Sequence, residues 1–507
     1  INVGNLLLVR GAARQREIAV RYVLGASRSR ILRQCLTDSL LLACAGTLAG
    51  FAVDSATIRI MMRILPGLSS AESITQIPLD SHVAGFLVIL AIATVFLFGL
   101  LPAWRTSSIN PSASMQQVPG SIQGVKLRRV SLVAQVALSF SLLLVAGLFL
   151  QACWRLQRAD PGFAVENRIY ATTYISQPEF TPEQVPAFYE KVLQDLRAVP
   201  FVRSTGLTYL LPLYPPATEC ASTPGSNRIT TTTSTISEGF LRTMNIPILR
   251  GRDFGPFDTR SSERVVLVNQ ALAERLWPNA PPVGQQIRLG CSQSQVAAVV
   301  GIVGNSRTVS LGKAPGPHVY LPFSQNPTGL ANIVVETSAP MGSAMDLLRR
   351  QVLNEGHGMR VYAVNRLSDH VQQSYWQLRW ESWLLCGFGV VALLLAAFGL
   401  YGLTSYSTAL RTKEFGVRMA LGAQPADVFR LVVREGLVLA LTGVGIGLVV
   451  SLSVTPVLAA FLFGMQATAA LVYMCIAALL LAVAGGACYL PARRSASVEP
   501  SITLRYE

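Results

Sequence analysis

The sequence predicts a mostly α-helical membrane protein, with two repeated modules of spanning helices and an α+β extracytoplasmic domain of two lobes. Three observations predict this fold class. Of the 507 residues, 51% are hydrophobic and only 14% are charged, whereas about 25% are charged in a typical soluble chain. Long apolar runs flank one large polar stretch, and two distant parts of the chain resemble each other.

The apolar runs predict the spans, because a helix needs about 20 mostly apolar residues to cross a bilayer. Runs of this kind are residues 36–57, 83–104, 131–153, 383–407, 431–453 and 469–490. Residues 1–9 look like the end of one more span, so we expect the N-terminal part of the first module to be missing. We interpret Asp54 as an interfacial acid at a helix exit; a functional intramembrane acid is the alternative.

The basic residues predict the orientation. They crowd into the segments that alternate crossings place on one side, which are residues 10–35, 105–130, 409–430 and 491–507. An excess of Lys and Arg marks the cytoplasmic side. The formal charge of +15 therefore indicates topology, and no interleaving of basic and aromatic residues points to nucleic acid as a partner.

The predicted organisation follows from these spans. It comprises the C-terminal part of the first module (1–117), a cytoplasmic linker (118–130), the first span of the second module (131–153), the external domain (154–380) and the core of the second module (381–507).

The external domain alternates strand-like and helical stretches, which favours an α+β fold. Runs rich in Val, Ile and Thr predict strands at 168–176, 203–211, 228–236, 265–269, 296–303 and 332–337. Apolar spacing predicts helices at 182–198, 270–277 and 341–354. Asn269 is a suitable N-cap for the second helix. We interpret Thr230–Thr235 as an exposed strand face in preference to a ligand site, and no ligand pocket is predicted.

Cysteine usage agrees with an external domain. Cys220 and Cys291 are the two cysteines that lie within it. An oxidising compartment permits a disulfide between them, and two free buried thiols are the alternative.

An internal repeat relates the two ends of the chain. REIAVRYVLGASRSRILRQCLTDSLLLACAGTLAG (16–50) matches KEFGVRMALGAQPADVFRLVVREGLVLALTGVGIG (413–447) without gaps, and LPAWRTSSINPSASMQ (101–116) matches LPARRSASVEPSITLR (490–505). Because two blocks match in the same order, we interpret the chain as two copies of one membrane module.

Each copy predicts a short helix, a sharp bend and a re-entering helix at the cytoplasmic face, in segments 11–33 and 409–430. The acid–base pairs at i,i+4 are Glu17–Arg21 and Glu414–Arg418. Each helix then stops at Leu-Gly, which is Leu24-Gly25 or Leu421-Gly422. We expect a compact knob that docks a cytoplasmic partner; a basic turn with weak surface ion pairs is the alternative.

Small residues repeat on the following spans. Gly46 and Gly50 in one copy correspond to Gly443 and Gly447 in the other. This spacing predicts close helix–helix packing.

Several kinds of chemistry are missing from the sequence. It has no G-x-x-x-x-G-K-[ST] loop to cradle phosphate, and no His/Cys/acid cluster at metal spacing. We therefore expect a chain that is not itself an enzyme and has no cofactor of its own. Energy for work across the membrane would have to come from a partner.

Several segments of the sequence resemble a known family. The repeated segments resemble the permease core of MacB- and FtsX-type ABC transporters. SEGFLRTMNIPILRGRDF (237–254) and VVLVNQALAERLWPNAPPVGQQIRLG (265–290) resemble that family's periplasmic core domain. Two fused permease modules in one chain resemble most the duplicated orphan permeases of Acidobacteria.

The resemblance implies a permease subunit in the bacterial inner membrane, multi-pass, with the large domain in the periplasm. Segments 11–33 and 409–430 would be coupling helices that dock on a separate cytoplasmic ABC ATPase dimer, which binds ATP and Mg. In this mechanism, called mechanotransmission, ATPase motion passes through the spans to the periplasmic domain. The movement would export or extract an amphiphilic, peptide, lipid or drug-like substrate. Membrane lipid and a periplasmic adaptor or outer-membrane channel are implied partners, and a pseudo-symmetric monomer is expected in preference to a homodimer.

A second function remains open from the sequence, namely a transmembrane signalling scaffold that regulates a periplasmic hydrolase without transport. The resemblance also exposes a difference between the copies. The first coupling segment carries Arg28, Arg30 and Arg33, whereas the second carries Gln424, Asp427 and Arg430. Their docking surfaces would differ in charge; drift after duplication is the alternative.

Overall fold

A computed structural model of the chain describes residues 28–64, five positions between 85 and 96, and residues 122–175, 181, 183–215, 217–223, 228–291, 295–354, 359–461 and 470–497. These residues form two compact units, one mostly of long helices and one built on a β-sheet. The expected stub 1–9 and most of the expected span 83–104 lie outside the described residues.

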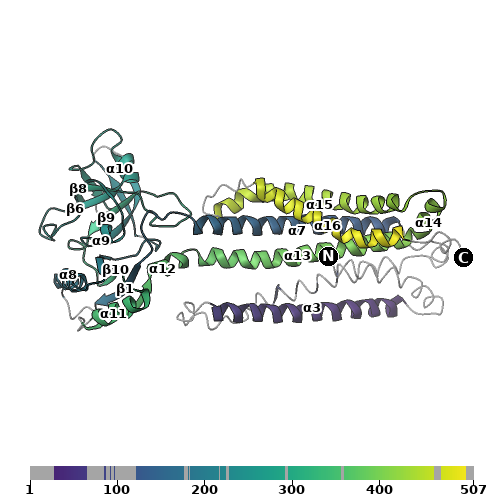
Figure 1. Cartoon of the computed structure of the whole chain (residues 1–507), viewed down its shortest axis with the longest axis horizontal. Helices are drawn as coiled ribbons and strands as arrows, with labels where there is room; N and C mark the ends of the chain where they lie inside the picture. The colour runs from purple at the N-terminus through teal and green to yellow at the C-terminus, as the bar shows by residue number, and fades with distance from the viewer. Residues whose placement is uncertain are drawn as a thin grey trace. The chain divides into compact units, whose positions relative to one another are not determined.

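Within the described residues, four helices are long and apolar enough to cross a membrane. They are α7 (Ile122–Gln157), α13 (Trp376–Leu410), α15 (Pro425–Phe461) and α16 (Ala470–Ala496), and they cover the spans expected at 131–153, 383–407, 431–453 and 469–490 (Figure 1). The expected span 36–57 lies inside a further long helix, α3 (Arg28–Ile64).

Helix α7 begins before the span expected at 131–153. The cytoplasmic linker predicted at 118–130 is helical from Ile122 onward, because α7 begins there. The residues that follow, Val125 to Arg129, include good helix formers and no proline, so the helix of the span continues into them.

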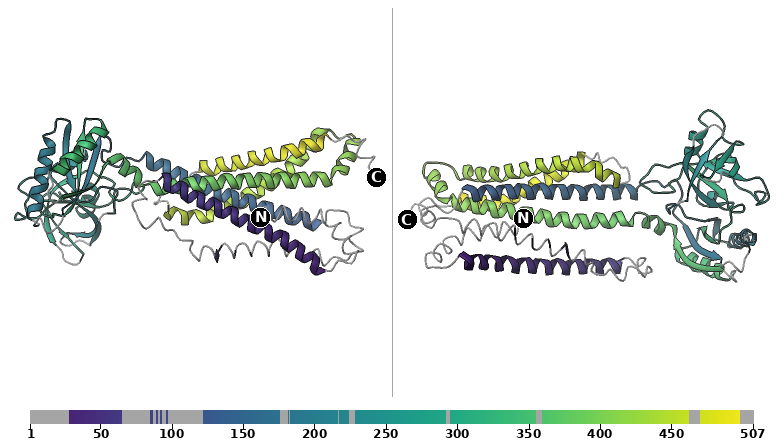
Figure 2. Two further views of the ribbon diagram at one scale, coloured as in Figure 1. Left: turned by 90° about the horizontal axis from the view of Figure 1, so that it is seen from below. Right: turned by 180° about the vertical axis from the view of Figure 1, so that it is seen from behind.

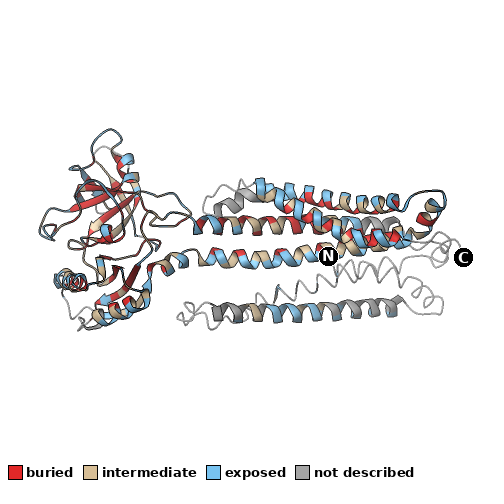
Figure 3. Cartoon of the chain, viewed as in Figure 1, coloured by how far each residue is buried: buried red, intermediate tan, exposed pale blue. Residues whose placement is uncertain are grey.

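The four long helices share a small core at one level. Each contributes one fully buried residue, namely Leu132 from α7, Leu400 from α13, Ala440 from α15 and Ala484 from α16. Figure 3 shows that α7 carries the most continuous buried surface of the four. The other three expose large apolar side chains on their outer faces, as expected for helices in lipid.

The second unit contains a sheet of 11 strands. The strands are β1 (Arg168–Ile175), β2 (Val202–Thr208), β3 (Ala217–Ser222), β4 (Ile229–Ile236), β5 (Ile248–Gly251), β6 (Val265–Asn269), β7 (Gln286–Leu289), β8 (Gln295–Val303), β9 (His318–Pro322), β10 (Leu330–Thr337) and β11 (Met359–Arg366). The helices are α8 (Gln184–Arg197), α9 (Phe240–Thr243), α10 (Gln270–Leu276), α11 (Met341–Asn354) and α12 (Leu367–Gln373).

The strands and helices predicted for this domain are confirmed within two residues at most boundaries. The predicted N-cap is also confirmed, since the side chain of Asn269 accepts a hydrogen bond from the backbone N–H of Leu272 at 3.0 Å. Strands β3, β5, β7, β9 and β11 and the short helices α9 and α12 were not predicted.

One end of the sheet is antiparallel, in the order β11-β1-β10-β2. Helices α8 and α11 pack together over these strands (Figure 2). The core between helices and strands is apolar, with Tyr189 and Leu193 of α8 against Ile169, Leu207 and Ile333 of the strands. The hydroxyl of the buried Tyr189 forms a hydrogen bond with Thr173 Oγ1 at 3.0 Å.

The other end of the sheet closes on itself. The pairings run β4-β3-β7-β8-β6-β9, and β9 pairs in parallel with β4 to complete the circuit. We call these six strands the β ring. Its apolar core includes Val266 and Val268 of β6, Val299 of β8 and Val319 of β9, together with Leu272 of α10.

The two ends of the sheet join at a narrow place. Strands β2 and β4 share one residue pair, Thr208 with Ile236. Beside it, Ser237 N–H donates to the carbonyl of Leu207 at 2.8 Å, and Tyr209 N–H donates to the carbonyl of Thr235 at 2.9 Å. One sheet therefore carries two separate hydrophobic cores.

Candidate functional site

The segment between α13 and α15 folds into the helix and bend that the repeat predicts. Helix α14 spans Thr412–Ala420. It ends in a Schellman turn, in which Ala423 N–H donates to the carbonyl of Arg418 at 3.0 Å and Gly422 N–H to that of Met419 at 3.1 Å. Gly422 has φ +99°, a conformation that side chains with a Cβ rarely adopt.

The chain then re-enters a helix at once. Pro425 is the first residue of α15, where its missing N–H costs no hydrogen bond. Asp427 accepts from the backbone N–H of Gln424 at 3.1 Å, which satisfies a donor at the helix start. Both ends of the bend are therefore fixed by local hydrogen bonds.

Charged side chains fasten α14 to its neighbours. Arg411, just before the helix, donates to Glu414 through Nε at 2.8 Å and to Glu435 of α15 through Nη1 at 2.8 Å. The other carboxylate oxygen of Glu435 lies 3.8 Å from Arg129 of α7. Glu414 also accepts from Arg418 at 2.5 Å. This network ties α14, α15 and α7 together.

The network sets the ionisation of its members. Hydrogen bonds from Arg411 lower the pKa of Glu414 below its usual value, and hydrogen bonding to Glu414 raises that of Arg411. Because these side chains are about one third exposed, each single pair stabilises the fold only modestly. Their joint effect is to hold one geometry.

Helix α14 has a buried face and an exposed face. Phe415 is 1% exposed and packs with Val428 and Val432 of α15 and Ala492 of α16. On the outside, Val417 is 45% exposed and Leu421 is 83% exposed. A rigid helix that presents two apolar side chains beside Arg418 suits docking in an apolar groove of a partner.

The first copy carries the corresponding residues in segment 11–33. Glu17, Arg21, Leu24 and Gly25 lie outside the described residues. The difference in charge expected between segments 11–33 and 409–430 therefore stays a prediction.

The glycines predicted to pack helices differ between the copies. A Cβ at Gly443 would lie 2.7 Å from Cβ of Val136, and one at Gly447 would lie 2.8 Å from the carbonyl oxygen of Ala137. Both contacts are with α7, so these glycines allow α15 to approach it closely. At Gly46 and Gly50 of α3, a Cβ would meet no atom of the described residues within 4 Å.

The sequence reasoning missed Arg411, Glu435 and Arg129. One signal was available, because Glu435 lies inside the expected span 431–453, and an acid within a span is a functional candidate by default. Its partners lie on other helices, so no local spacing indicated them.

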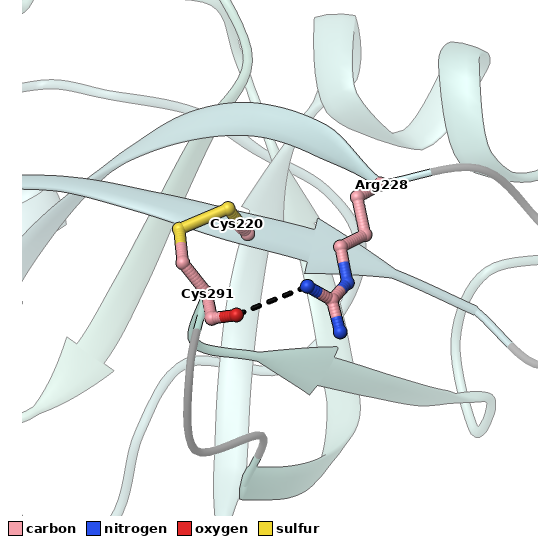
Figure 4. The surroundings of a disulfide bond; sticks show 3 residues. All are labelled: Cys220, Arg228 and Cys291. Carbon is pink, nitrogen blue, oxygen red and sulfur yellow. Dashed lines mark hydrogen bonds between the residues drawn. A yellow bond between two sulfur atoms is a disulfide. The ribbon is translucent and has the colours of Figure 1, made fainter.

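The two cysteines of the external domain lie together in the second unit. The structure joins Cys220 of β3 to Cys291 in a disulfide that closes a sequence separation of 71. Arg228 Nη1 donates to the carbonyl of Cys291 at 3.0 Å (Figure 4). Strands β3 and β7 share only two residue pairs. The disulfide therefore reinforces one of the short strand pairings of the β ring.

Comparison with known protein families places both units. The model of the FtsX-like permease C-terminal region matches residues 1–111 and 387–500, and that of the MacB-like periplasmic core domain matches residues 154–353. The chain belongs to the MacB/FtsX permease family. The membrane-spanning helices and the periplasmic-type domain of this permease fit an inner-membrane protein with its domain in the periplasm.

Curated relatives match about half of this chain and are themselves longer. The permease is 25% identical over 288 residues to the macrolide export ATP-binding/permease protein MacB of Hahella chejuensis, a match that covers 54% of this chain and 42% of that protein. It is 26% identical over 282 residues to the pyoverdine export ATP-binding/permease protein PvdT of Pseudomonas putida, covering 53% and 42%. The permease thus matches less than half the length of these relatives.

Among solved structures, the periplasmic region of MacB from Actinobacillus actinomycetemcomitans is similar at 14% identity, covering 42% of this chain and 94% of that one, with a TM-score of 0.29.

Proposed function

We propose that the chain is the permease component of an ABC transporter, moved by a separate cytoplasmic ATPase dimer that binds ATP and Mg. The observation that carries this proposal is the two-sided character of α14. Val417 and Leu421 are exposed on one side, whereas Phe415 is buried in the bundle on the other. A docked partner could push on such a helix without bending it.

Force applied to α14 has a defined route within the helical unit. Arg411 and Glu435 connect α14 to α15, and Glu435 faces Arg129 of α7. Closure of the ATPase on ATP binding would therefore displace α15 and α7 together. No substrate would need to pass between the spanning helices, so the mechanism is mechanotransmission.

The repeat supplies a second docking element. An ATPase dimer offers two equivalent grooves, and segments 11–33 and 409–430 would each fill one. The match of one family model to residues 1–111 and to residues 387–500 supports two modules in one chain. A pseudo-symmetric monomer is the expected assembly.

The proposed substrate is an amphiphile, peptide, lipid or drug-like molecule that is exported or extracted on the periplasmic side. The outer face of α13 exposes Trp383, Phe388 and Phe398, which suits contact with membrane lipid. A periplasmic adaptor or outer-membrane channel would complete the export route.

Co-purification with each ABC ATPase of the host, followed by measurement of ATPase stimulation, tests the proposal. Leu421→Asp should abolish binding of the cognate ATPase, because it places a charge in an apolar contact. Leu249→Asp is the matched control, since Leu249 is a 49% exposed leucine on β5. Charge reversal at Arg21 and Arg418 together should weaken binding. Equal binding by all variants would remove these segments from the interface.

A further inference from the structure

The β ring has an inside and an outside that follow from strand alternation. Successive side chains of a strand point to opposite faces. Val266 and Val268 of β6, Ala297 and Val299 of β8, and Val319 of β9 lie in the ring's core. Side chains an even number of positions away along the same strand therefore point to the same, inward side of the ring.

A cleft of about 460 Å³ is lined by six residues that alternation places on the inward side of the ring. These residues are Ala217, Thr233, Thr235, Arg264, Gln295 and Leu321. Arg264 directly precedes β6, and Gln295 begins the parallel strand β8, so the cleft opens at the end of the ring where these two strands start. Helix α10 follows the other end of β6 and packs into the core there. The cleft is thus the open mouth of a ring that is covered at its opposite end.

The mouth is basic and polar. Arg260 and Arg264 line it, and among its described lining residues none carries a carboxylate. Arg264 has no ion-pair partner among the described residues, whereas Arg260 reaches Glu183 at 2.8 Å in an exposed pair. Thr233 and Tyr209 also line the mouth, and their hydroxyls have no hydrogen-bond partner in the described part of the chain.

The segment that carries the arginines is held in place. Gln325 Nε2 donates to the carbonyl of Glu263 at 2.8 Å and to that of Thr259 at 3.1 Å, while its Oε1 accepts from Val265 N–H at 3.2 Å. The backbone carbonyl of Arg264 accepts from Ala298 N–H at 2.8 Å. The backbone that carries both arginines is therefore held in one conformation before any ligand binds, which favours binding by lowering its entropy cost.

We propose that this mouth binds an anionic, hydroxyl-bearing molecule, such as a sugar that carries a phosphate or a carboxylate group. Guanidinium groups recognise both anions through paired hydrogen bonds. The threonine and tyrosine hydroxyls would bond the sugar, and the volume falls in the range of small-molecule sites. The exposed strand face predicted for Thr230–Thr235 is wrong in part. Thr231 is fully buried, and Thr233 and Thr235 line the mouth. The proposal does not depend on coupling to an ATPase.

Isothermal titration calorimetry on the full chain in detergent micelles tests the proposal, with glucose 6-phosphate, glucuronate and glucose as probes. The two anionic sugars distinguish phosphate from carboxylate as the recognised group, and glucose should not bind. Arg264→Gln should weaken binding of the anionic sugar about tenfold or more, as expected for loss of a charged hydrogen-bond donor. Arg275→Gln is the matched control, because Arg275 is also an exposed arginine of this domain but lies on α10, outside the cleft.

Thr233→Val separates the two parts of the site. It should weaken binding of the sugar phosphate and leave binding of inorganic phosphate unchanged, since only the hydroxyl contact is lost. Unchanged unfolding temperatures will show that the variants fold. Failure of both anionic sugars to bind, or equal weakening by Arg264→Gln and Arg275→Gln, would overturn the proposal.

Discussion

Arg411 donates through Nη1 to Oε1 of Glu435 at 2.8 Å, across 24 positions of sequence. This bond joins the start of α14 to the side of α15. Because Arg411 also holds Glu414, one guanidinium group contacts both helices. In the proposed mechanism this bond transmits movement, whereas Val417 and Leu421 contact the ATPase.

Glu435→Gln should separate these two roles. The ATPase should still co-purify, because the exposed face of α14 is unchanged. Its stimulation by the permease should fall about two- to thirtyfold, the range in which single residues change coupling. Glu381→Gln on α13 is the control, because Glu381 accepts a hydrogen bond from Gln377 of the same helix at 3.0 Å and lies outside the network of Arg411 and Glu435. Equal loss of binding and stimulation would assign Glu435 to the interface instead.

Gly447→Val should loosen the contact between α15 and α7. The new side chain would overlap the carbonyl of Ala137 and the ring of Phe140, and overpacking of this kind costs about 1–3 kcal/mol. Gly445→Val offers a matched control, because no atom of the described residues lies within 4 Å of a Cβ at Gly445. The thermal unfolding of both variants in detergent, followed by tryptophan fluorescence, measures the difference. A similar shift in both would point to helix propensity as the cause.

The disulfide can be tested by mass mapping under non-reducing conditions, which should yield one linked peptide pair containing Cys220 and Cys291. The double variant Cys220→Ser/Cys291→Ser should lower the free energy of unfolding by about 2–4 kcal/mol, because the bond closes a long loop. Reduction of the wild-type protein should produce a similar loss, and the double variant should not respond to reductant.

Acid should destabilise the β ring through His318. Burial lowers the pKa of His318 to about 3, whereas the unfolded chain has a histidine pKa near 6.5. Between these values the unfolded state binds a proton that the folded state does not. The stabilisation is complete above about pH 6.5 and is lost toward pH 3, by up to about 1.4 kcal/mol per pH unit.

His318→Phe should flatten this pH dependence in part. Burial also lowers the pKa of His370, so the double variant His318→Phe/His370→Phe should flatten it further. Unfolding temperatures measured from pH 7 to pH 4 provide the comparison. An unchanged slope in the double variant would mean that other groups control the acid response.

Much of the fold was predictable from local patterns. Strand β6, with four consecutive apolar residues, and helix α10, with its Asn269 cap, follow from short stretches of sequence. The bend at Gly422 was predictable because a Leu-Gly stop and Pro425 occur close together. These features depend on interactions within a few residues.

The features that were missed depend on distant residues. Strand β9 has five residues and is defined by its pairing with β4 and β6, which closes the ring. Arg264 and Thr233 come together only once that ring has formed. Glu435 forms its ion pairs with Arg411 and Arg129, which are distant from it in sequence. No periodicity in one segment can indicate such neighbours.

The single pair Thr208–Ile236 between β2 and β4 has a consequence for folding dynamics. Two apolar cores linked by so short a ladder should behave as two cooperative foldons, each opening at its own free energy. Native-state hydrogen exchange would then show two levels of amide protection, one for β1, β10 and α8 and one for β6, β8 and α10. The periplasmic domain would be able to flex at this joint without unfolding either part.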